Sequence, residues 1–591
     1  MTYAANLATL SRTPLLHVRL KLDSCTRTFG TAPCLATGEP CYNTFCTCVY
    51  PSAFVAGTKN YDYTSADVRV APGAVPGRPY IKGVTFLSTE ITDNVTLSGR
   101  IKIELYDEPC EDIGADPYIA SRTTPAAGTY FRRLLARNPN YKGRMVEIRE
   151  GFAGDAFCEL QLRANEPLDL VTVNKNVVTL QTIDLLKGLG EITVPPKVDL
   201  KLLTAMTAAS VEVMLAETAD FSKVPSTGYL LIDDEIIEYS AVDAGQRRLT
   251  VATRGANGTT AAEHSESTAV TLCRYFAPAN PFDIMLEILT VDAGLTTDQV
   301  DVDAFEAARD WPGLEIPATA FLTEPVKVSE LLIGRKENTT LTAASGAADS
   351  YGLADLLDCK VWVGEDLKIT IRRNIANAPG RTYRALSDAN NVIVNSTSVD
   401  MHEVSRINVC VLYWDKSALG KIDDQAAYGR RDIAVNGPAV DEYGDQVVER
   451  IFCRWLKNNL VSEEEQAAYI SDMLLRRLLH RQDAAPVITL STELKDSDIK
   501  TGDFATLATD ELCNPDGMPL NTRFQIIRRE NKGKAIDLKV QRMPLRRCAF
   551  YADTAANTYA AATAAQQEYG GFYTDPDTGK MTNGDAGFYY Y

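Results

Sequence analysis

Histidine is scarce in this sequence, and the short motifs of the common enzyme classes are missing from it. The sequence has no Gly-x-Ser-x-Gly nucleophile turn, no Gly-x-x-x-x-Gly-Lys-Ser/Thr phosphate loop and no His-Glu-x-x-His zinc motif. A histidine-rich catalytic centre is not expected, and these absences favour a structural or assembly role over an enzyme. Only four histidines occur among 591 residues, and they are widely spaced: His17, His264, His402 and His480.

Long apolar runs and an excess of basic residues are missing as well. No run approaches the roughly 20 apolar residues of a membrane-spanning helix, so no membrane span is expected. The formal net charge is −18, whereas a general nucleic-acid-binding surface is basic. Met1 to Leu16 lacks the basic start and the continuous apolar core of a secretory signal peptide. The length of the chain implies several domains.

Five of the thirteen cysteines are crowded into one short window. Turn-forming residues separate them, so the window is expected to be a loop that can fold several thiols inward around one centre. The other eight cysteines are scattered singly, which is typical of small buried hydrophobic residues. The crowded cysteines are Cys25, Cys34, Cys41, Cys46 and Cys48.

Three interpretations of this window compete. Disulfide bonds suit short secreted chains with an even number of cysteines, and neither condition applies. Structural zinc favours Cys-x2-4-Cys pairs, but the only close pair is Cys46 and Cys48. An iron–sulfur cluster is larger than one ion, and four well-separated thiolates can wrap it. Spacing alone favours a bound metal, with a cluster on Cys25, Cys34, Cys41 and Cys48 only modestly ahead of zinc and with Cys46 as a spare.

Strand patterns dominate the chain, so an α+β, mainly β fold is expected. Alternating apolar and polar residues predict a strand at 96–106 and two-stranded hairpins within 228–239, 359–372 and 523–542, among others. Apolar stripes predict helices near 128–138, 282–289, 303–310 and 327–335. These patterns predict an N-terminal segment with the cysteine loop (1–79), a strand-rich domain (80–195), a small β domain (196–275), a mixed α/β domain (276–376), a second strand-rich domain (377–545) and an Ala-, Gly- and Tyr-rich tail (546–591).

Several polar groups have ready structural explanations. Asp233 and Asp234 stand between two strands and predict a tight hairpin turn rather than an acidic catalytic site. His264 is expected to be a loop residue. Ser462 and Glu465 form a capping box, which predicts the start of a helix. The helix predicted near 128–138 is expected to turn its arginines toward solvent.

The residues around the cysteines resemble a known protein family. Cys25-Thr-Arg-Thr-Phe-Gly-Thr-Ala-Pro-Cys34 and Cys41-Tyr-Asn-Thr-Phe-Cys-Thr-Cys48 are similar to the cysteine loop of tail-tip or baseplate hub proteins from phages with long non-contractile tails and from gene transfer agents. That family carries the pattern Cys…Ala-Pro-Cys…Cys-x-Asn-Thr-x-x-Thr-Cys, which holds a [4Fe-4S] cluster. The match falls on Cys25, Cys34, Cys41 and Cys48, whereas Cys46 stands where the family usually has another residue.

The similarity extends along the chain. The segments 112–118 and 128–139 look like the first hub barrel. The segment 233–239, together with Arg254, Gly255 and His264, is similar to a small β domain of tail proteins. The resemblance implies two β-barrel domains related to the tail tube, at 80–195 and 377–545, with the small β domain inserted between them.

The resemblance also implies a role, a cofactor and partners. It implies a non-enzymatic virion protein at the tail tip, assembled in the host cytoplasm, whose homotrimer joins the hexameric tail tube to a threefold tip and lines the DNA exit channel. The implied neighbours are the distal tail protein or tail tube above, a tip or central fibre protein below and the tape measure protein, while the genome DNA passes without specific binding. The implied cofactor is a [4Fe-4S] cluster on the four matched cysteines, with zinc as the runner-up.

Two other functions stay open. An iron–sulfur metalloenzyme would need a second cofactor motif or a substrate motif, and the sequence shows neither. A tail-associated protein that cuts the cell wall would need a catalytic glutamate or a Cys/His group in a compact domain. The separated histidines disfavour the Cys/His form of that centre.

Overall fold

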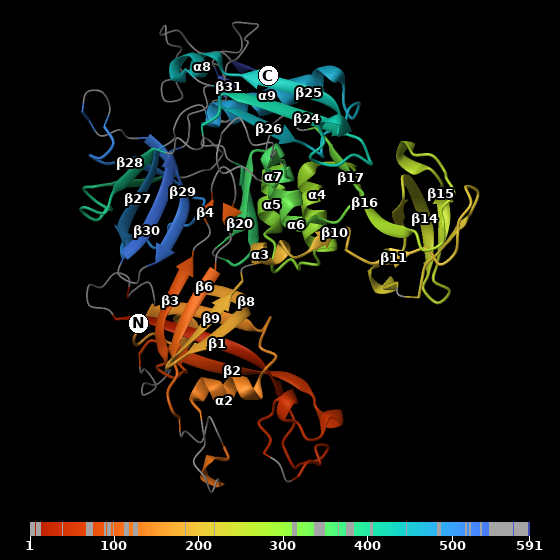
Figure 1. The fold of residues 1–591 in the computed structure, drawn as a ribbon. Coiled ribbons are helices and arrows are strands. Elements are labelled where there is room, and N and C mark those ends of the chain that lie inside the picture. The colour runs from red at the N-terminus through yellow and green to blue at the C-terminus, as the bar shows by residue number, and fades with distance from the viewer. Residues whose placement is uncertain are drawn as a thin grey trace.

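The computed structural model describes the greater part of the chain. Within these residues the protein is mainly β with a few helices, and the predicted α+β, mainly β fold class is confirmed. Figure 1 shows separate sheets around a centre of short helices. The described residues are 6, 13–37, 40–66, 75–87, 90–91, 96–97, 100–110, 117–121, 128–183, 185–217, 219–309, 316–335, 349–364, 366–373, 383–401, 406–444, 446–481, 486–513, 517–518, 522–531, 535–542, 571–572 and 589–590.

A seven-stranded antiparallel sheet forms the N-terminal part of the molecule (Figure 1, red to orange). Every second residue of its strand β9 is buried, as expected for a strand with one face on a core. Tyr63, together with Phe131 and Leu134 of helix α2 (Tyr130–Arg137), packs into that core. The strands in order across the sheet are β2 (Ala56–Thr64), β1 (Pro14–Cys25), β7 (Met145–Phe152), β8 (Gln161–Asn174), β9 (Val177–Thr182), β6 (Arg100–Tyr106) and β3 (Ile81–Leu87).

The predicted division at residue 79 runs through this sheet. β1 pairs with β2 on one side and with β7 on the other, so that Val18 lies opposite both Tyr63 and Ile148. β3, at the far edge, also contacts β1, which shows that the sheet curls back on itself. The N-terminal segment and the strand-rich region that follows are therefore one unit, because the strand leading into the cysteine loop is hydrogen-bonded on both sides.

The region predicted as a small β domain has its own sheet and core (Figure 1, yellow). Asp233 takes a left-handed conformation, with φ of 52°, in the turn between β13 and β14, as the hairpin motif predicts. The long strand β16 continues beyond this sheet and pairs there with β17 (Ala318–Leu322). The strands across the sheet are β11 (Leu200–Lys201), β16 (Ala269–Ala279), β13 (Gly228–Ile232), β14 (Glu235–Asp243), β15 (Arg248–Thr253) and β12 (Glu212–Met214).

Several helices and a hairpin share one central core. Phe282, Trp455 and Tyr469 are all buried in this core, which draws on residues from both sides of the predicted boundary at 376. That boundary therefore does not separate two cores. The helices are α3 (Leu185–Leu189), α4 (Pro281–Glu287) with the π-helical turn Ile288–Asp292, α5 (Val302–Arg309), α6 (Val328–Ile333), α7 (Leu353–Leu356) and α9 (Glu463–Arg481), and the hairpin is β20 (Cys359–Val363) with β21 (Ile369–Arg373).

The region predicted as a second barrel, 377–545, holds two sheets instead of one. They are separate because their apolar faces pack into different cores: Leu412 and Ile451 join the central core, whereas Ile488 and Leu538 form another. The first sheet, which contacts α9, has the order β19 (Asp349–Ser350), β26 (Val448–Phe452), β24 (Val409–Lys416) and β25 (Tyr428–Val435). The second has the order β22 (Tyr383–Ser387), β28 (Phe504–Ala508), β29 (Thr522–Asn531), β30 (Ala535–Arg542), β27 (Pro486–Glu493) and β23 (Ser398–Met401).

Short elements complete the described structure. Apart from one strand pair, the predicted tail 546–591 lies outside the described residues. Among the described helices, none has the length and apolar character needed to cross a membrane. The short elements are β4 (Glu90–Ile91) with β5 (Thr96–Leu97), β10 (Thr193–Val194) with β18 (Val326–Lys327), β31 (Gly571–Phe572) with β32 (Tyr589–Tyr590), and helix α8 (Gly437–Tyr443).

The predicted capping box is formed at the start of α9. Glu465 N donates to Ser462 Oγ at 3.3 Å, and Ser462 N donates to Glu465 Oε2 at 3.1 Å. Ser462→Ala removes the capping oxygen and is expected to lower the free energy of unfolding by about 1 kcal/mol, measured by thermal denaturation. Ser462→Asp keeps such an oxygen and is expected to stay close to wild type. Equal stability of the two variants would show that the cap contributes nothing.

Candidate metal centre in the cysteine loop

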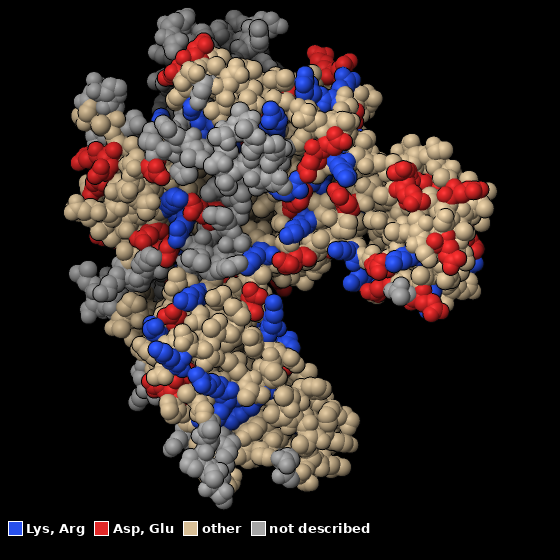
Figure 2. All heavy atoms as spheres, viewed as in Figure 1, with Lys and Arg blue, Asp and Glu red and all other residues tan. Residues whose placement is uncertain are grey.

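The pairing of β1 with β2 positions the cysteine loop, residues 26–55. The two strands stay paired to their ends, where Cys25 lies opposite Ala56, and the loop projects beyond the sheet (Figure 1). From Thr28 to Thr58 the only charged residue is Glu39. Figure 2 shows this end of the molecule as a surface almost free of charged side chains. Large apolar side chains are exposed on it: Leu35, Phe45, Val49, Tyr50 and Val55.

Backbone hydrogen bonds fold the loop back to its root. Cys25 N donates to Asn43 O at 2.6 Å, and Thr26 N donates to Val55 O at 3.0 Å. Asn43 has a left-handed φ of 59°, a conformation that asparagine adopts more readily than most residues. The middle of the loop therefore lies beside Cys25, although the two are far apart along the loop.

The segment from Cys41 to Cys48 is a turn held by its own hydrogen bonds. Asn43 N donates to Cys41 Sγ at 3.4 Å. The hydroxyl oxygens of Thr44 and Thr47 lie 2.9 Å apart. A backbone N–H directed at a cysteine sulfur is a common feature around thiolate ligands, because it stabilises their charge. The Asn and Thr residues of the family pattern thus have structural roles in this turn.

Three other thiols of the loop lie near enough to Cys41 to influence it. Burial raises the pKa of Cys41, and the hydrogen bond with the backbone of Asn43 lowers it. The thiols of Cys48, Cys34 and Cys25 raise this pKa further, because each would place a like charge near that of Cys41. The cysteines grouped in this way are the four that match the family pattern.

The fifth cysteine of the loop is placed differently. Cys46 is exposed on the 3₁₀ turn Phe45–Thr47, whereas Cys34 is buried. Every cysteine in the described part of the chain carries a free thiol. In the same part of the chain, no group of three His, Cys, Asp or Glu side chains is gathered closely enough to hold a metal ion.

Contacts from residues 118–137 attach the cysteine loop to the first sheet. Tyr118 Oη accepts a hydrogen bond from Cys41 N at 3.1 Å and donates to Cys41 O at 2.9 Å. The guanidinium carbon of Arg137, on α2, lies 3.8 Å from the ring centre of Tyr42. Two of the arginines of α2 that were expected to face solvent, Arg133 and Arg137, instead line a hollow of about 280 Å³ beside Cys41.

The scattered cysteines and His17 are not gathered into this loop. His17 is buried in β1, where its Nε2 lies 3.1 Å from Asp62 Oδ1 and its ring meets Phe157 edge to face. Cys548, His402 and the side chain of His480 lie outside the described residues. Five scattered cysteines are buried, as expected for small apolar residues, and two are exposed: Cys110, Cys273, Cys359, Cys410 and Cys453, then Cys158 and Cys513.

A second polar cluster, which sequence reasoning missed, lies in the small β domain. Glu235 is buried, and its carboxylate accepts from Arg254 Nε at 2.6 Å and Arg254 Nη2 at 2.8 Å. Gly255 N and Ala262 N also donate to it, and His264 Nε2 lies 2.8 Å from its Oε2. Burial alone would raise the pKa of Glu235, but these partners lower it to about 2. His264, expected to be an ordinary loop residue, is therefore a buried part of a structural cluster.

Comparisons with known proteins find similarity to solved structures. No protein-family model matches the chain, and no curated protein matches it. The 43 kDa tail protein of prophage MuSo2 from Shewanella oneidensis is 10% identical, with a TM-score of 0.34 over 78% of this chain and 95% of its own. The prophage tail protein gp18 from Listeria monocytogenes EGD-e is 11% identical, with a TM-score of 0.30 over 78% of this chain and 89% of its own. A chain of the native gene transfer agent virion is 16% identical, with a TM-score of 0.21 over 30% of this chain and 34% of its own.

Proposed function

We propose that this protein is a structural component of a phage-like tail, namely the hub of its tip or baseplate. The observation that carries the proposal is that Cys25, Cys34, Cys41, Cys48 and the residues around them match the hub pattern, and that the other three thiols are near enough to Cys41 to raise its pKa. The exposure of Cys46, which has no counterpart in that pattern, supports the same assignment.

Cys25, Cys34, Cys41 and Cys48 are the proposed ligands of a [4Fe-4S] cluster, whose binding would require their thiols to lie closer together than they do among the described residues. Four thiolates are the usual ligand set of such a cluster, which would supply a cross-link between distant parts of the loop. Among the described loop residues only Cys34, Ala36 and Thr44 are buried, so the loop has little apolar core of its own. A structural metal group contributes its binding free energy to folding in such cases. The proposed role of the cluster is therefore structural, and the protein is proposed not to be an enzyme.

In the proposed assembly, a homotrimer joins the hexameric tail tube to a threefold tip at the end of the virion tail. The curled seven-stranded sheet and the six-stranded sheet are the proposed tube-like domains. The exposed apolar surface of the cysteine loop supports a contact with a neighbouring protein, because such patches mark interfaces. The net charge of −18 suits a channel that DNA crosses without being held, since DNA phosphates attract basic groups.

The proposed neighbours follow from that position. They are the distal tail protein or tail tube on one side, the tip or central fibre protein on the other, and the tape measure protein within the channel. Antibodies against this chain are expected to label the tail tip of assembled particles in electron micrographs. Labelling along the tail or on the head would contradict the proposed position, and lysis of cell-wall substrate by the purified protein would contradict the non-enzymatic role.

Purification without oxygen tests the proposed cofactor. The expected result is about four iron atoms and four labile sulfides per chain, with visible absorption from the cluster. If the protein contains zinc instead of iron, the site is a zinc site and not a cluster. If it contains neither metal, the proposed cofactor is wrong. Native mass measured on the same sample is expected to be three times the 64.7 kDa of the chain.

A further inference from the structure

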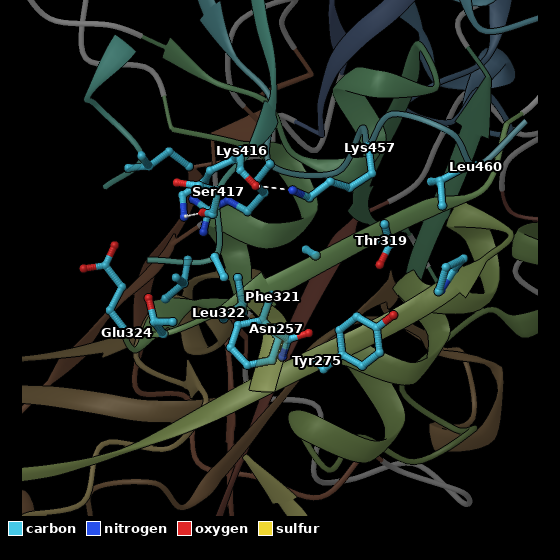
Figure 3. Close-up of a pocket in the computed structure, with 17 residues that line it drawn as sticks. Asn257, Tyr275, Thr319, Phe321, Leu322, Glu324, Lys416, Ser417, Lys457 and Leu460 are labelled. Carbon is cyan, nitrogen blue, oxygen red and sulfur yellow. Dashed lines mark hydrogen bonds between the residues drawn. The ribbon is translucent and has the colours of Figure 1, made fainter. Parts of the chain in front are cut away.

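A cavity of about 440 Å³ lies between the small β domain and the centre of the molecule. Its walls come from the loop after β15, the β16–β17 pair, the end of β24 and the segment after β26. Figure 3 shows Lys416 and Lys457 on one side and the side chains of Tyr275 and Phe321 on the other. The volume is that of a site for a small organic molecule.

Three basic side chains line the cavity, but they differ in their ion pairs. Arg454 Nη2 donates to Glu330 Oε1 at 2.6 Å. Lys457 Nζ lies 3.4 Å from Asp415 Oδ1. Lys416, in contrast, has no carboxylate within 4.0 Å among the described residues. One cation of the cavity is thus left without a close counter-charge.

Burial and neighbouring cations disfavour the positive charge of Lys416. Burial, followed by the nearby charges of Arg454 and Lys457, lowers the pKa of Lys416 to about 8, although Glu324 acts in the opposite direction. Its Nζ donates to Ser417 O at 3.2 Å, which is a neutral acceptor. Arg454 is 6% exposed, and its Nε has no hydrogen-bond partner among the described residues. An anion placed between these side chains would stabilise both cations.

The opposite wall of the cavity is aromatic and apolar. The ring centre of Phe321 lies 5.3 Å from that of Tyr229 and 6.0 Å from that of Tyr275, so the three rings pack against one another. Tyr275 is 36% exposed, which leaves part of its ring accessible. Leu322 and Leu460 add aliphatic surface. A ligand that fits both walls combines a negative charge with an apolar body.

We propose that this cavity binds a monocarboxylate with an aromatic or other apolar body. Its carboxylate would pair with Lys416, and its body would lie against Tyr275 and Phe321. One negative charge fits better than two, because Arg454 already has a carboxylate partner and Glu324 also borders the cavity. The same chemistry is offered by a free organic acid and by the C-terminal residue of a partner's chain. The proposal is independent of the cysteine loop and of the proposed tail function.

Protection of Lys416 from acylation tests the proposal on the whole, unmodified protein. At pH 8, mass spectrometry of peptides measures how fast an amine-reactive ester modifies Lys416 and the exposed Lys421. Saturating phenylacetate is expected to slow the modification of Lys416 at least about tenfold, because a charge-assisted pair holds the amine protonated. Phenylacetamide and inorganic phosphate are expected to protect far less, and Lys421 is expected to react equally in every case. Equal protection by phenylacetamide, stronger protection by phosphate, or no protection by phenylacetate would overturn the proposal.

Calorimetric titration of variants provides the second measurement. Lys416→Met keeps the aliphatic stem and is expected to weaken phenylacetate binding about tenfold, whereas Lys421→Met is expected to bind like wild type. Matching thermal denaturation curves establish that both variants are folded. N-acetylphenylalanine, which imitates a chain terminus, distinguishes the two sources: tighter binding than phenylacetate assigns the site to a partner's C-terminus, and weaker binding assigns it to a free acid. Unchanged phenylacetate affinity in Lys416→Met would remove Lys416 from the site.

Discussion

Cys41→Ser is expected to remove most of the iron from protein purified without oxygen. Cys41 is the proposed ligand whose pKa is raised by all three of the others, Cys48, Cys34 and Cys25. A serine hydroxyl stays protonated near pH 7 and is a poor substitute for a thiolate. Iron and labile sulfide per chain are expected to fall several-fold together. Serine at any of the other three positions is expected to have the same effect.

Cys46→Ser is the matched control for this series. It makes the same chemical change in the same loop, two residues from Cys48, but at an exposed thiol outside the proposed ligand set. It is expected to keep the wild-type iron content and the wild-type resistance of residues 26–55 to limited proteolysis, whereas Cys41→Ser is expected to lose both. If Cys46→Ser also loses iron, or if Cys41→Ser keeps it, the proposed ligand set is wrong.

The turn from Cys41 to Cys48 was open to prediction because its sequence signal is local. Asn43 directs its N–H at Cys41 Sγ, and Thr44 and Thr47 join their hydroxyls, all within a span of a few residues. A pattern of residues at fixed spacing can therefore predict such a turn. The contact between Tyr118 and Cys41 has no sequence pattern that predicts it, because it depends on how distant segments pack. Local chemistry was thus predictable, and the surroundings of the loop were not.

Two predicted domain boundaries, at 79 and 376, do not separate sheets or cores, for a related reason. Alternating apolar residues identify a strand, but they do not identify the strand it pairs with. β24 and β27 both have such patterns, yet Leu412 and Ile488 enter different cores. β1 was likewise assigned to a separate N-terminal segment, although it pairs with β7 in the same sheet. The fold class follows from counting strands, whereas the division into units needs their partners.

Glu235→Gln is expected to destabilise the small β domain by about 3–5 kcal/mol, the usual effect of removing one charge from a buried ion pair. The amide keeps the size of the side chain but leaves Arg254 and His264 without their shared negative charge. Hydrogen exchange of peptides from 198–275 measures the effect, because it reports stability region by region. Asp234→Asn, an exposed change in the adjacent hairpin turn, is the control and is expected to stay within about 0.5 kcal/mol of wild type.

The acid dependence of stability provides a second measure of the same carboxylate. The pKa of Glu235 is about 2 in the folded protein, against about 4.3 in an unfolded chain. The ionised form therefore stabilises the fold by roughly 3 kcal/mol; this contribution is complete above about pH 5 and is lost as the pH falls toward 2. Glu235→Gln has no such proton to gain, so protection of residues 198–275 is expected to fall much less between pH 6 and pH 3 in the variant than in wild type. The same fall in both proteins would mean that other carboxylates govern the acid stability of this domain and that the cluster around Glu235 does not.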